Sequence, residues 1–115
     1  MFTLKWTEDA DVTYRELKIK AEVSAKNRKA KGKKKTGKDE GLFKQINKTI
    51  EHLRANPKHP GLQTHEYHSL ENPHKKGEKV FEAYVQDKTP AAFRVFWCYG
   101  PKKDELTLIG ITAHP

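Results

Sequence analysis

The last third of the chain, residues 80–115, constrains the fold more strongly than any other region. It contains three short runs rich in Val, Ile, Phe, Tyr, Trp and Thr, the residue types typical of β-strands. Segments 87–90 and 100–104 separate these runs, and each combines a turn-forming residue with a proline. Because strands joined by short turns run antiparallel, the region predicts a three-stranded β-meander that forms the scaffold of the domain.

The middle run of this meander places a charged residue among large apolar ones. Neighbouring side chains of a strand point to opposite faces of the sheet. The bulkier face, which we expect to pack on helices, carries Phe93, Val95, Trp97 and Tyr99. The other face carries Arg94, Phe96 and Cys98. A buried arginine is costly unless it meets an anion or a carboxylate, so Arg94 indicates either a phosphate-binding site or a structural cross-strand pair with Glu82.

The first two-thirds of the chain predict one strand, two helices and a further strand. Alternation in residues 2–6 indicates the first strand. An apolar stripe predicts a helix over residues 9–29, and Thr7 with the acidic residues after it suits the beginning of that helix. A second helix is predicted over residues 42–55, and residues 62–70 read as a weaker strand. The second helix has the clearest helical period, formed by Phe43, Ile46, Ile50 and Leu53.

These elements occur in the order β-α-α-β-β-β-β. This order predicts a single α+β domain over residues 1–115, with two helices on one face of a mainly antiparallel twisted sheet. We see no signal peptide and no apolar run long enough to cross a membrane, so we expect a cytoplasmic protein. Cys98 is the one cysteine, which excludes an intramolecular disulfide, and its apolar strand favours a buried thiol over a nucleophile.

The positive charge of the chain is concentrated in residues 15–38. This segment holds eleven lysine and arginine residues and two glutamates, a balance of +9 in a chain whose net charge is +8. Such a block is attracted to phosphate backbones whatever their base sequence, and the attraction weakens with salt. We expect it to bind nucleic acid; a solvated charge run without a partner is the alternative. The expected contacts are Lys26, Arg28, Lys29, Lys31, Lys33, Lys34, Lys35 and Lys38.

Two further features of the sequence concern loops and metals. Residues 30–41 contain three glycines and five lysines and predict a flexible loop between the two helices. His65 and His68 have a spacing that invites a metal site, but in a strand residues three apart face opposite sides and cannot share an ion. No cysteine pair and no HExxH motif accompanies them, so we predict neither a metal nor a cofactor.

The element order, the basic helical pair and the C-terminal meander resemble the RelE/ParE superfamily of bacterial type II toxins, over most of the chain. The most specific part is residues 91–101, AAFRVFWCYGP. In that family an aromatic–Arg–aliphatic strand carries an active-site arginine, and Phe93, Arg94 and Val95 match this pattern. The final TAHP, residues 112–115, resembles the polar end of the family's last strand, where some members have a histidine.

The resemblance implies a toxin that cleaves mRNA, with the ribosomal A site as the expected place of action. RNA can be cut without a metal when its 2′-hydroxyl attacks the adjacent phosphodiester, which requires a base, a cation and an acid. Our candidates are Glu82 as the base, Arg94 as the phosphate clamp and His114 as the acid. Tyr84 could stack on a base or orient the phosphate. For His114, a frayed chain end is the alternative.

A non-enzymatic role is the second reading of the same resemblance. Glu82 and Tyr84 stand where ribosome-dependent nucleases of this family usually carry basic residues, although some members use a glutamate as the base. The chain could then be a module of the same fold that poisons a topoisomerase, or that binds nucleic acid or a protein partner. Under the toxin reading, the resemblance implies a small acidic antitoxin protein as a partner.

Overall fold

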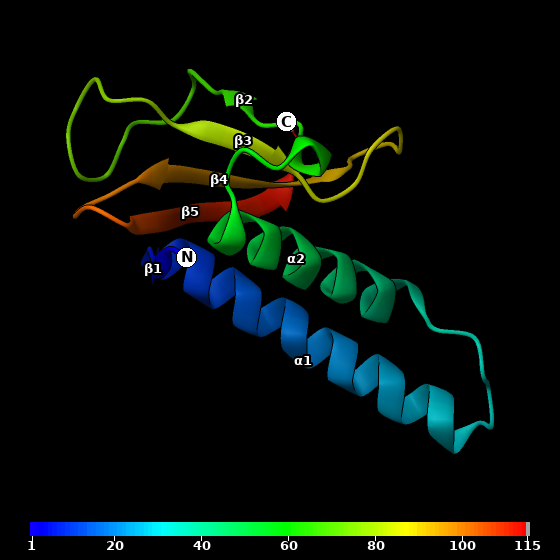
Figure 1. Ribbon diagram of the computed structural model, residues 1–115. Helices are drawn as coiled ribbons and strands as arrows, with labels where there is room; N and C mark the ends of the chain where they lie inside the picture. The colour runs from blue at the N-terminus through cyan, green and yellow to red at the C-terminus, as the bar shows by residue number, and fades with distance from the viewer. Residues whose placement is uncertain (115) are drawn as a thin grey trace.

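The computed structural model describes residues 1–114, in which two long helices lie on one face of a five-stranded sheet (Figure 1). Along the chain the elements are β1 (Thr3–Trp6), α1 (Glu8–Ala30), α2 (Lys38–Ala55), a 3-10 turn η1 (Pro60–Leu62), β2 (His65–Glu66), β3 (Phe81–Tyr84), β4 (Phe93–Tyr99) and β5 (Glu105–Ala113). The predicted order and the α+β class are confirmed. Within the described residues, no helix is both long and apolar enough to span a membrane.

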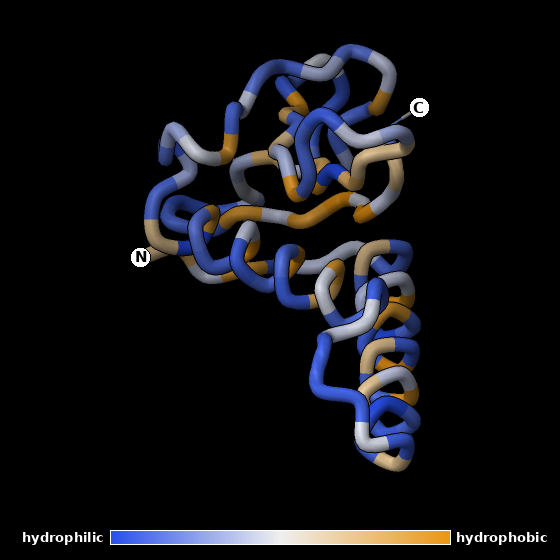
Figure 2. The backbone as a smooth tube through the Cα atoms, turned by 90° about the vertical axis from the view of Figure 1, so that its right-hand side faces the viewer, coloured by the Kyte–Doolittle hydropathy of each residue, from blue (hydrophilic) through white to orange (hydrophobic). Residues whose placement is uncertain are grey.

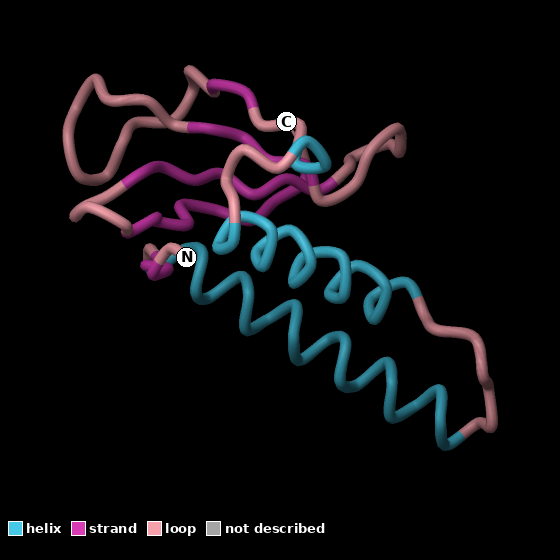
Figure 3. The backbone as a smooth tube through the Cα atoms, viewed as in Figure 1, coloured by secondary structure: helices cyan, strands magenta, loops and turns pink. Residues whose placement is uncertain are grey.

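The strands are arranged in the order β1-β5-β4-β3-β2 (Figure 3). The three C-terminal strands form the predicted antiparallel meander, and β2 adds to its edge, also antiparallel. β1 pairs with β5 in parallel. The strand predicted over residues 62–70 is reduced to two residues, because η1 takes up Leu62 and Gln63 adopts a left-handed conformation with φ 48° that interrupts the extended chain.

Both helices begin at side-chain or backbone caps that the sequence supplies. The Thr7 hydroxyl oxygen accepts a hydrogen bond from the Ala10 N–H at 3.2 Å, as its position before an acidic first turn predicted. α2 begins at Lys38, four residues earlier than the prediction of residue 42. There the Glu40 carboxylate accepts a long hydrogen bond, 3.5 Å, from the Gly37 N–H. The connection between the helices is therefore residues 31–37, which contain no hydrophobic residue and are blue to nearly white in Figure 2.

A paired arginine and glutamate join the two helices near this connection. Arg28 Nε lies 2.8 Å from Glu40 Oε1, and Arg28 Nη2 lies 3.0 Å from Glu40 Oε2. This two-point contact holds the pKa of Glu40 below its usual value. The geometry is the bidentate one that makes guanidinium–carboxylate pairs specific. The pair fixes the end of the helical hairpin, which extends beyond the sheet (Figure 1).

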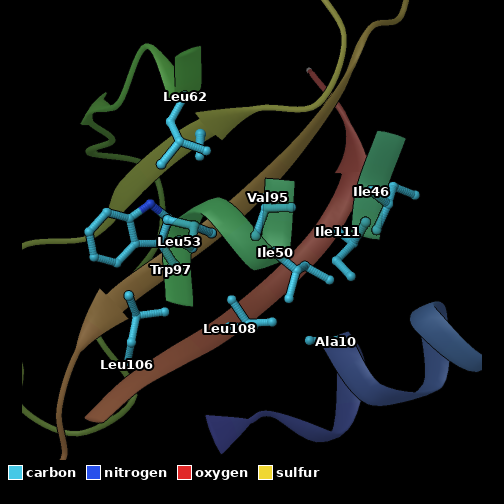
Figure 4. Close-up of a cluster of buried hydrophobic side chains, with 11 residues drawn as sticks. Ala10, Ile46, Ile50, Leu53, Leu62, Val95, Trp97, Leu106, Leu108 and Ile111 are labelled. Atoms are coloured by element: carbon cyan, nitrogen blue, oxygen red, sulfur yellow. The ribbon is translucent and has the colours of Figure 1, made fainter. Parts of the chain in front are cut away.

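The hydrophobic core lies between α2 and the central strands (Figure 4). Its main members are Ile46, Ile50 and Leu53 of α2, Val95 and Trp97 of β4, and Leu106, Leu108 and Ile111 of β5. The predicted docking of α2 on the bulky face of β4 is thus confirmed for these residues. Phe43 contacts Tyr14 instead, with ring centroids 5.2 Å apart, and Tyr99 at the end of the strand is 44% exposed.

A β-bulge in β5 changes which of its side chains share a face. Phe96 pairs with Gly110, whereas Trp97 pairs with Leu108, so Ile109 is an extra residue without a partner. Leu108 before the bulge and Ile111 after it both face the core. As a result Thr112 pairs with Arg94 and lies on the opposite face of the sheet, away from the helices. The end of β5 is thereby turned towards the side that carries Arg94.

The first prediction concerns the packing of α2. Ile50 is 5% exposed in the core, so Ile50→Ala should lower the free energy of unfolding by roughly 2–5 kcal/mol, from lost burial plus a cavity. Chemical denaturation of the purified protein measures it. Ile19→Ala is the matched control, because Ile19 is 60% exposed on α1 and its truncation should leave stability nearly unchanged. Equal effects of the two substitutions would contradict this packing.

Candidate functional site

The structure brings the four predicted site residues together on the outer face of the sheet, which is the face turned away from the helices. Tyr84 of β3 pairs with Arg94 of β4, and Arg94 pairs with Thr112 of β5. Cross-strand partners point to the same side of a sheet, so all three share this face. Glu82 lies two residues before Tyr84 and points the same way. His114 follows Thr112 by two residues and reaches the same face.

Glu82 and His114 are in direct contact. Nδ1 of His114 lies 2.5 Å from Oε2 of Glu82, a hydrogen bond between a buried carboxylate and a half-exposed imidazole. The backbone N–H of His114 also donates to the Ala92 carbonyl at 2.8 Å. This bond continues the pairing of β4 and β5 beyond Ala113. His114 is therefore held by two hydrogen bonds, one from its backbone and one from its side chain.

A second histidine contacts the same carboxylate. His65 of β2 pairs with Glu82 across the strands, and its Nε2 lies 2.7 Å from Glu82 Oε1. The contact is that of an ion pair whose angle falls outside hydrogen-bond geometry, so Oε1 has no hydrogen-bond partner within residues 1–114. From the sequence, His65 was considered only as a metal ligand together with His68, and that site was rejected. The one signal that could have identified it is its register opposite Glu82, which a two-residue strand does not reveal.

Arg94 is a buried cation without a carboxylate partner. It is 7% exposed, and among the described residues no acidic side chain forms an ion pair with it. Its Nη1 donates to the carbonyls of Gln86, at 2.5 Å, and Phe93, at 3.1 Å. The guanidinium also lies over the Tyr84 ring, with Cζ 3.7 Å from the ring centroid, in a cation–π contact. Neutral partners leave the positive charge uncompensated, which favours an anion at this position.

The structural alternative for Arg94, a cross-strand pair with Glu82, does not form. The register explains this, because Arg94 stands opposite Tyr84, whereas Glu82 stands opposite Phe96. Phe96 itself is 2% exposed and is covered by Tyr67, with ring centroids 4.7 Å apart. Glu82 and Arg94 thus have separate partners on one face, the two histidines for the first and the Tyr84 ring for the second.

The basic residues lie on another part of the molecule, at the far end of the helical hairpin (Figure 1). The seven lysines predicted to bind nucleic acid are all exposed. Arg28 differs from them, because its guanidinium is paired with Glu40 and donates to the Lys33 carbonyl at 3.2 Å. We therefore assign Arg28 to the hairpin and not to the phosphate contacts predicted from the sequence.

The part of the chain that the structure describes shows no cluster of metal ligands. Within residues 1–114, no group of three His, Cys, Asp or Glu side chains is placed to hold an ion. The two histidines at Glu82 approach different oxygens of one carboxylate, which is an arrangement for sharing protons. The chemistry that the outer face supports is therefore proton transfer beside a cation.

Comparison with known proteins gives structural relatives but no sequence relatives. Neither a protein-family model nor a curated protein matches the chain. A YoeB/ParE toxin from Agrobacterium tumefaciens matches with a TM-score of 0.61 at 12% identity, covering 98% of this chain and 99% of that chain. A copper-bound mutant toxin from Helicobacter pylori has a TM-score of 0.56 at 18% identity, covering 99% and 96%.

The YoeB dimer from Staphylococcus aureus is also similar, with a TM-score of 0.56 at 9% identity, covering 99% of this chain and 98% of that chain. Identities this low establish a shared fold. The chain has the fold of the RelE/ParE toxins, as the resemblance of its sequence implied.

The second prediction concerns Cys98, which is fully buried in β4. Burial raises the pKa of its thiol to about 11, because the thiolate would be poorly solvated there. Near pH 8 the folded protein should therefore react with a thiol-specific disulfide reagent far more slowly than the same protein in denaturant. Rapid modification of the folded protein would show that the thiol is accessible and ionised.

Proposed function

We propose that this protein is the toxin of a type II toxin–antitoxin system and cleaves mRNA on the ribosome as an endoribonuclease. The observation that carries the proposal is the outer face of the sheet, where a half-exposed imidazole is held on a buried carboxylate beside an uncompensated arginine. The fold shared with three toxin structures supports the toxin role. It does not bear on the reaction, which rests on the chemistry of these side chains.

The proposed reaction is a transesterification that needs no metal. Nε2 of His114 removes the proton of the 2′-hydroxyl, and the 2′-oxygen attacks the adjacent phosphorus. The bond between phosphorus and the 5′-oxygen breaks, which leaves a 2′,3′-cyclic phosphate. Because the 5′-oxygen leaves on the side of phosphorus opposite the attacking 2′-oxygen, it takes up the proton of the imidazolium through a water molecule, and His114 thereby also serves as the acid that the sequence predicted. Arg94 stabilises the charge that develops on the phosphorane.

Glu82 has a different role in this scheme from the one expected from the sequence. Its side chain is 1% exposed and lies beneath two imidazoles, so it has no open path to a 2′-hydroxyl. It accepts the Nδ1–H of His114, which fixes the ring and directs Nε2 outwards. We therefore assign Glu82 as the positioning partner of His114 in place of the direct base. Tyr84 holds Arg94 through the cation–π contact.

The lysines at the end of the hairpin suit a second, sequence-independent contact with RNA. These lysines lie away from the outer face of the sheet (Figure 1). The RNA segment that they contact would therefore be a different one from the segment bound at Arg94. A large folded RNA such as that of the ribosome offers phosphates over a wide surface. This separation supports the ribosome as the place of action.

An acidic antitoxin is the partner that we propose for the toxin. The net charge of +8 provides electrostatic complementarity. Apolar surface is available on α1, where Val12, Ile19 and Val23 are 47%, 60% and 53% exposed. Phe96 on the outer face of the sheet is less suited to a partner, because it is buried under Tyr67.

A non-enzymatic module of the same fold is the second candidate. The observation that favours it is the low exposure of Arg94, whose Nη1 already donates to two carbonyls. Such a module, whether a topoisomerase poison or a binder of nucleic acid or protein, would act in stoichiometric amounts. An enzyme would cut many mRNA molecules per toxin molecule, so turnover distinguishes the two.

The third prediction tests the proposed reaction. In a reconstituted translation reaction, the wild-type protein at substoichiometric amounts should cut mRNA and leave 2′,3′-cyclic phosphate ends. Arg94→Ala and His114→Gln should each lower the cleavage rate by about 10²-fold or more, as for a lost charge stabiliser or proton-transfer group. Lys103→Ala and His68→Gln are matched controls, since both residues are exposed and form no hydrogen bond or ion pair with Glu82 or Arg94.

Circular dichroism and thermal unfolding would establish that the variants are folded. A wild-type protein that inhibits translation only in stoichiometric amounts, without cutting mRNA, would refute the enzymatic proposal. If both Arg94→Ala and His114→Gln cut mRNA at the wild-type rate, the protein is an endoribonuclease whose active site is formed by other residues.

The fourth prediction concerns the lysine-rich end of the hairpin. Replacing Lys33, Lys34 and Lys35 by Gln should weaken binding to RNA and lower the slope of log affinity against log salt by up to about 2–3, since each phosphate contact contributes a slope near one. Lys58, Lys102 and Lys103 replaced by Gln form a control of equal charge change, because all three are exposed on other loops. Equal losses in both variants would mean that net charge, and not this segment, determines binding.

A further inference from the structure

Two imidazoles, those of His65 and His114, contact the single buried carboxylate of Glu82. The reaction proposed above uses His114 and Glu82 but gives His65 no role. Oε2 of Glu82 meets Nδ1 of His114 at 2.5 Å, and Oε1 meets Nε2 of His65 at 2.7 Å. The side chains of His65 and His114 are 48% and 45% exposed, whereas that of Glu82 is 1% exposed. The three groups come from β2, from the end of β5 and from β3, so long-range folding assembles them.

The contacts of the two ring nitrogens of His65 indicate where its protons lie. Its Nδ1 lies 3.1 Å from the carbonyl oxygen of Gln63, which can only accept, so Nδ1 carries a hydrogen. Its Nε2 lies 2.7 Å from Glu82 Oε1, a distance at which two unprotonated atoms would repel each other, so one of the two carries a proton even though the angle of the contact is not that of a hydrogen bond. That proton makes either His65 an imidazolium or Glu82 a neutral acid. In both cases the pair of residues together carries no net charge.

The same reasoning fixes the state of His114. Since its Nδ1 contacts the other oxygen of Glu82, Nδ1 is the nitrogen that carries the hydrogen. With the charge of Glu82 already balanced by the proton shared with His65, a further proton on Nε2 would give the cluster a net positive charge. A poorly solvated cluster disfavours such a charge. The Nε2 of His114 then remains a free acceptor, and within residues 1–114 it makes no hydrogen bond.

We infer that His65 is a positioning residue, which balances the charge of Glu82 so that His114 rests neutral with Nε2 ready to accept the 2′-hydroxyl proton. The inference deepens the proposed function and rests on it. Without His65, the proton that compensates Glu82 must come from His114. The carboxylate would then be paired with His114 as an imidazolium, and the acceptor would be lost.

The neighbouring charged and titratable groups do not provide the same balance. Arg94 forms no ion pair with Glu82 and interacts with two carbonyls and the Tyr84 ring. Tyr84 contacts His65 edge to face, with ring centroids 5.9 Å apart, and supplies no charge. Among the described residues that contact Glu82, His65 is thus the one that can compensate its charge and leave His114 neutral.

The first arm of the test measures cleavage against pH in the reconstituted translation reaction. His65→Gln should cut at least about tenfold more slowly than wild type at pH 7, and its deficit should narrow as the pH is raised and a protonated His114 becomes less favoured. The rise of the rate with pH should therefore be displaced upwards. His68→Gln, an exposed histidine three residues away, should follow the wild-type profile. A purely structural loss would lower the rate equally at every pH.

The second arm observes the ring nitrogens directly in the RNA-free protein by nuclear magnetic resonance after ¹⁵N-histidine labelling. At pH 7 the wild type should show Nδ1 of His114 protonated and Nε2 unprotonated, whereas His65→Gln should show both nitrogens of His114 protonated. His114→Gln assigns the signals. If His114 has the same state in wild type and His65→Gln, the inference is wrong.

The two arms separate this inference from the proposed function. If the wild-type protein cuts no mRNA, the proposed reaction is refuted. The resonance experiment would then still show whether His65 controls the protonation of His114. A wild-type protein that cuts mRNA, together with a His65→Gln variant that has an unchanged pH profile, overturns the inference and leaves the reaction in place.

Discussion

The apolar contact between α2 and the central strands is the interaction on which the rest of the structure depends. Ile46, Ile50 and Leu53 cover Val95 and Trp97, and this contact uses one whole face of the meander. Because the helices occupy that face, the other face needs no apolar cover of the same extent and can hold Glu82 and Arg94. The core thus supports the inner face of the strands and keeps them rigid. Rigid strands hold proton-transfer groups more precisely than loops do.

The bulge at Ile109 determines which side chains at the end of β5 face the core and which face the candidate site. With regular alternation, a strand that buries Leu106 and Leu108 would also turn Gly110, Thr112 and His114 towards the helices. The extra residue inverts the alternation, so Ile111 enters the core and His114 reaches Glu82. A hydrogen bond at 2.7 Å from the Thr7 hydroxyl to the Ile109 carbonyl ties the bulge to the start of α1. One inserted residue therefore decides whether the outer face has an imidazole.

Local periodicity was enough to predict the elements and part of the site, because burial imposes the alternation of Val95 and Trp97 and the helical spacing of Ile46, Ile50 and Leu53. The same alternation placed Arg94 opposite the core. Sequence could not predict His65, whose role comes from cross-strand register in a two-residue strand. The bulge had one local signal, the isolated Gly110 within a strand pattern, but that signal does not say which residue is the extra one. Sequence also could not predict the early start of α2 at Lys38, since Glu40 is recruited by Arg28 from another helix.

The parallel pairing of β1 with β5 has a consequence for how the chain folds. The meander of β3, β4 and β5 joins neighbours along the chain and can form early, with short loops to close. β1 has no local partner, because Thr3 pairs with Glu105 and Trp6 with Leu108. Its addition must close a loop of nearly the whole chain, and such high contact order slows folding. The N-terminal strand, with the start of α1 anchored beside it, is therefore expected to join the sheet in a late folding step.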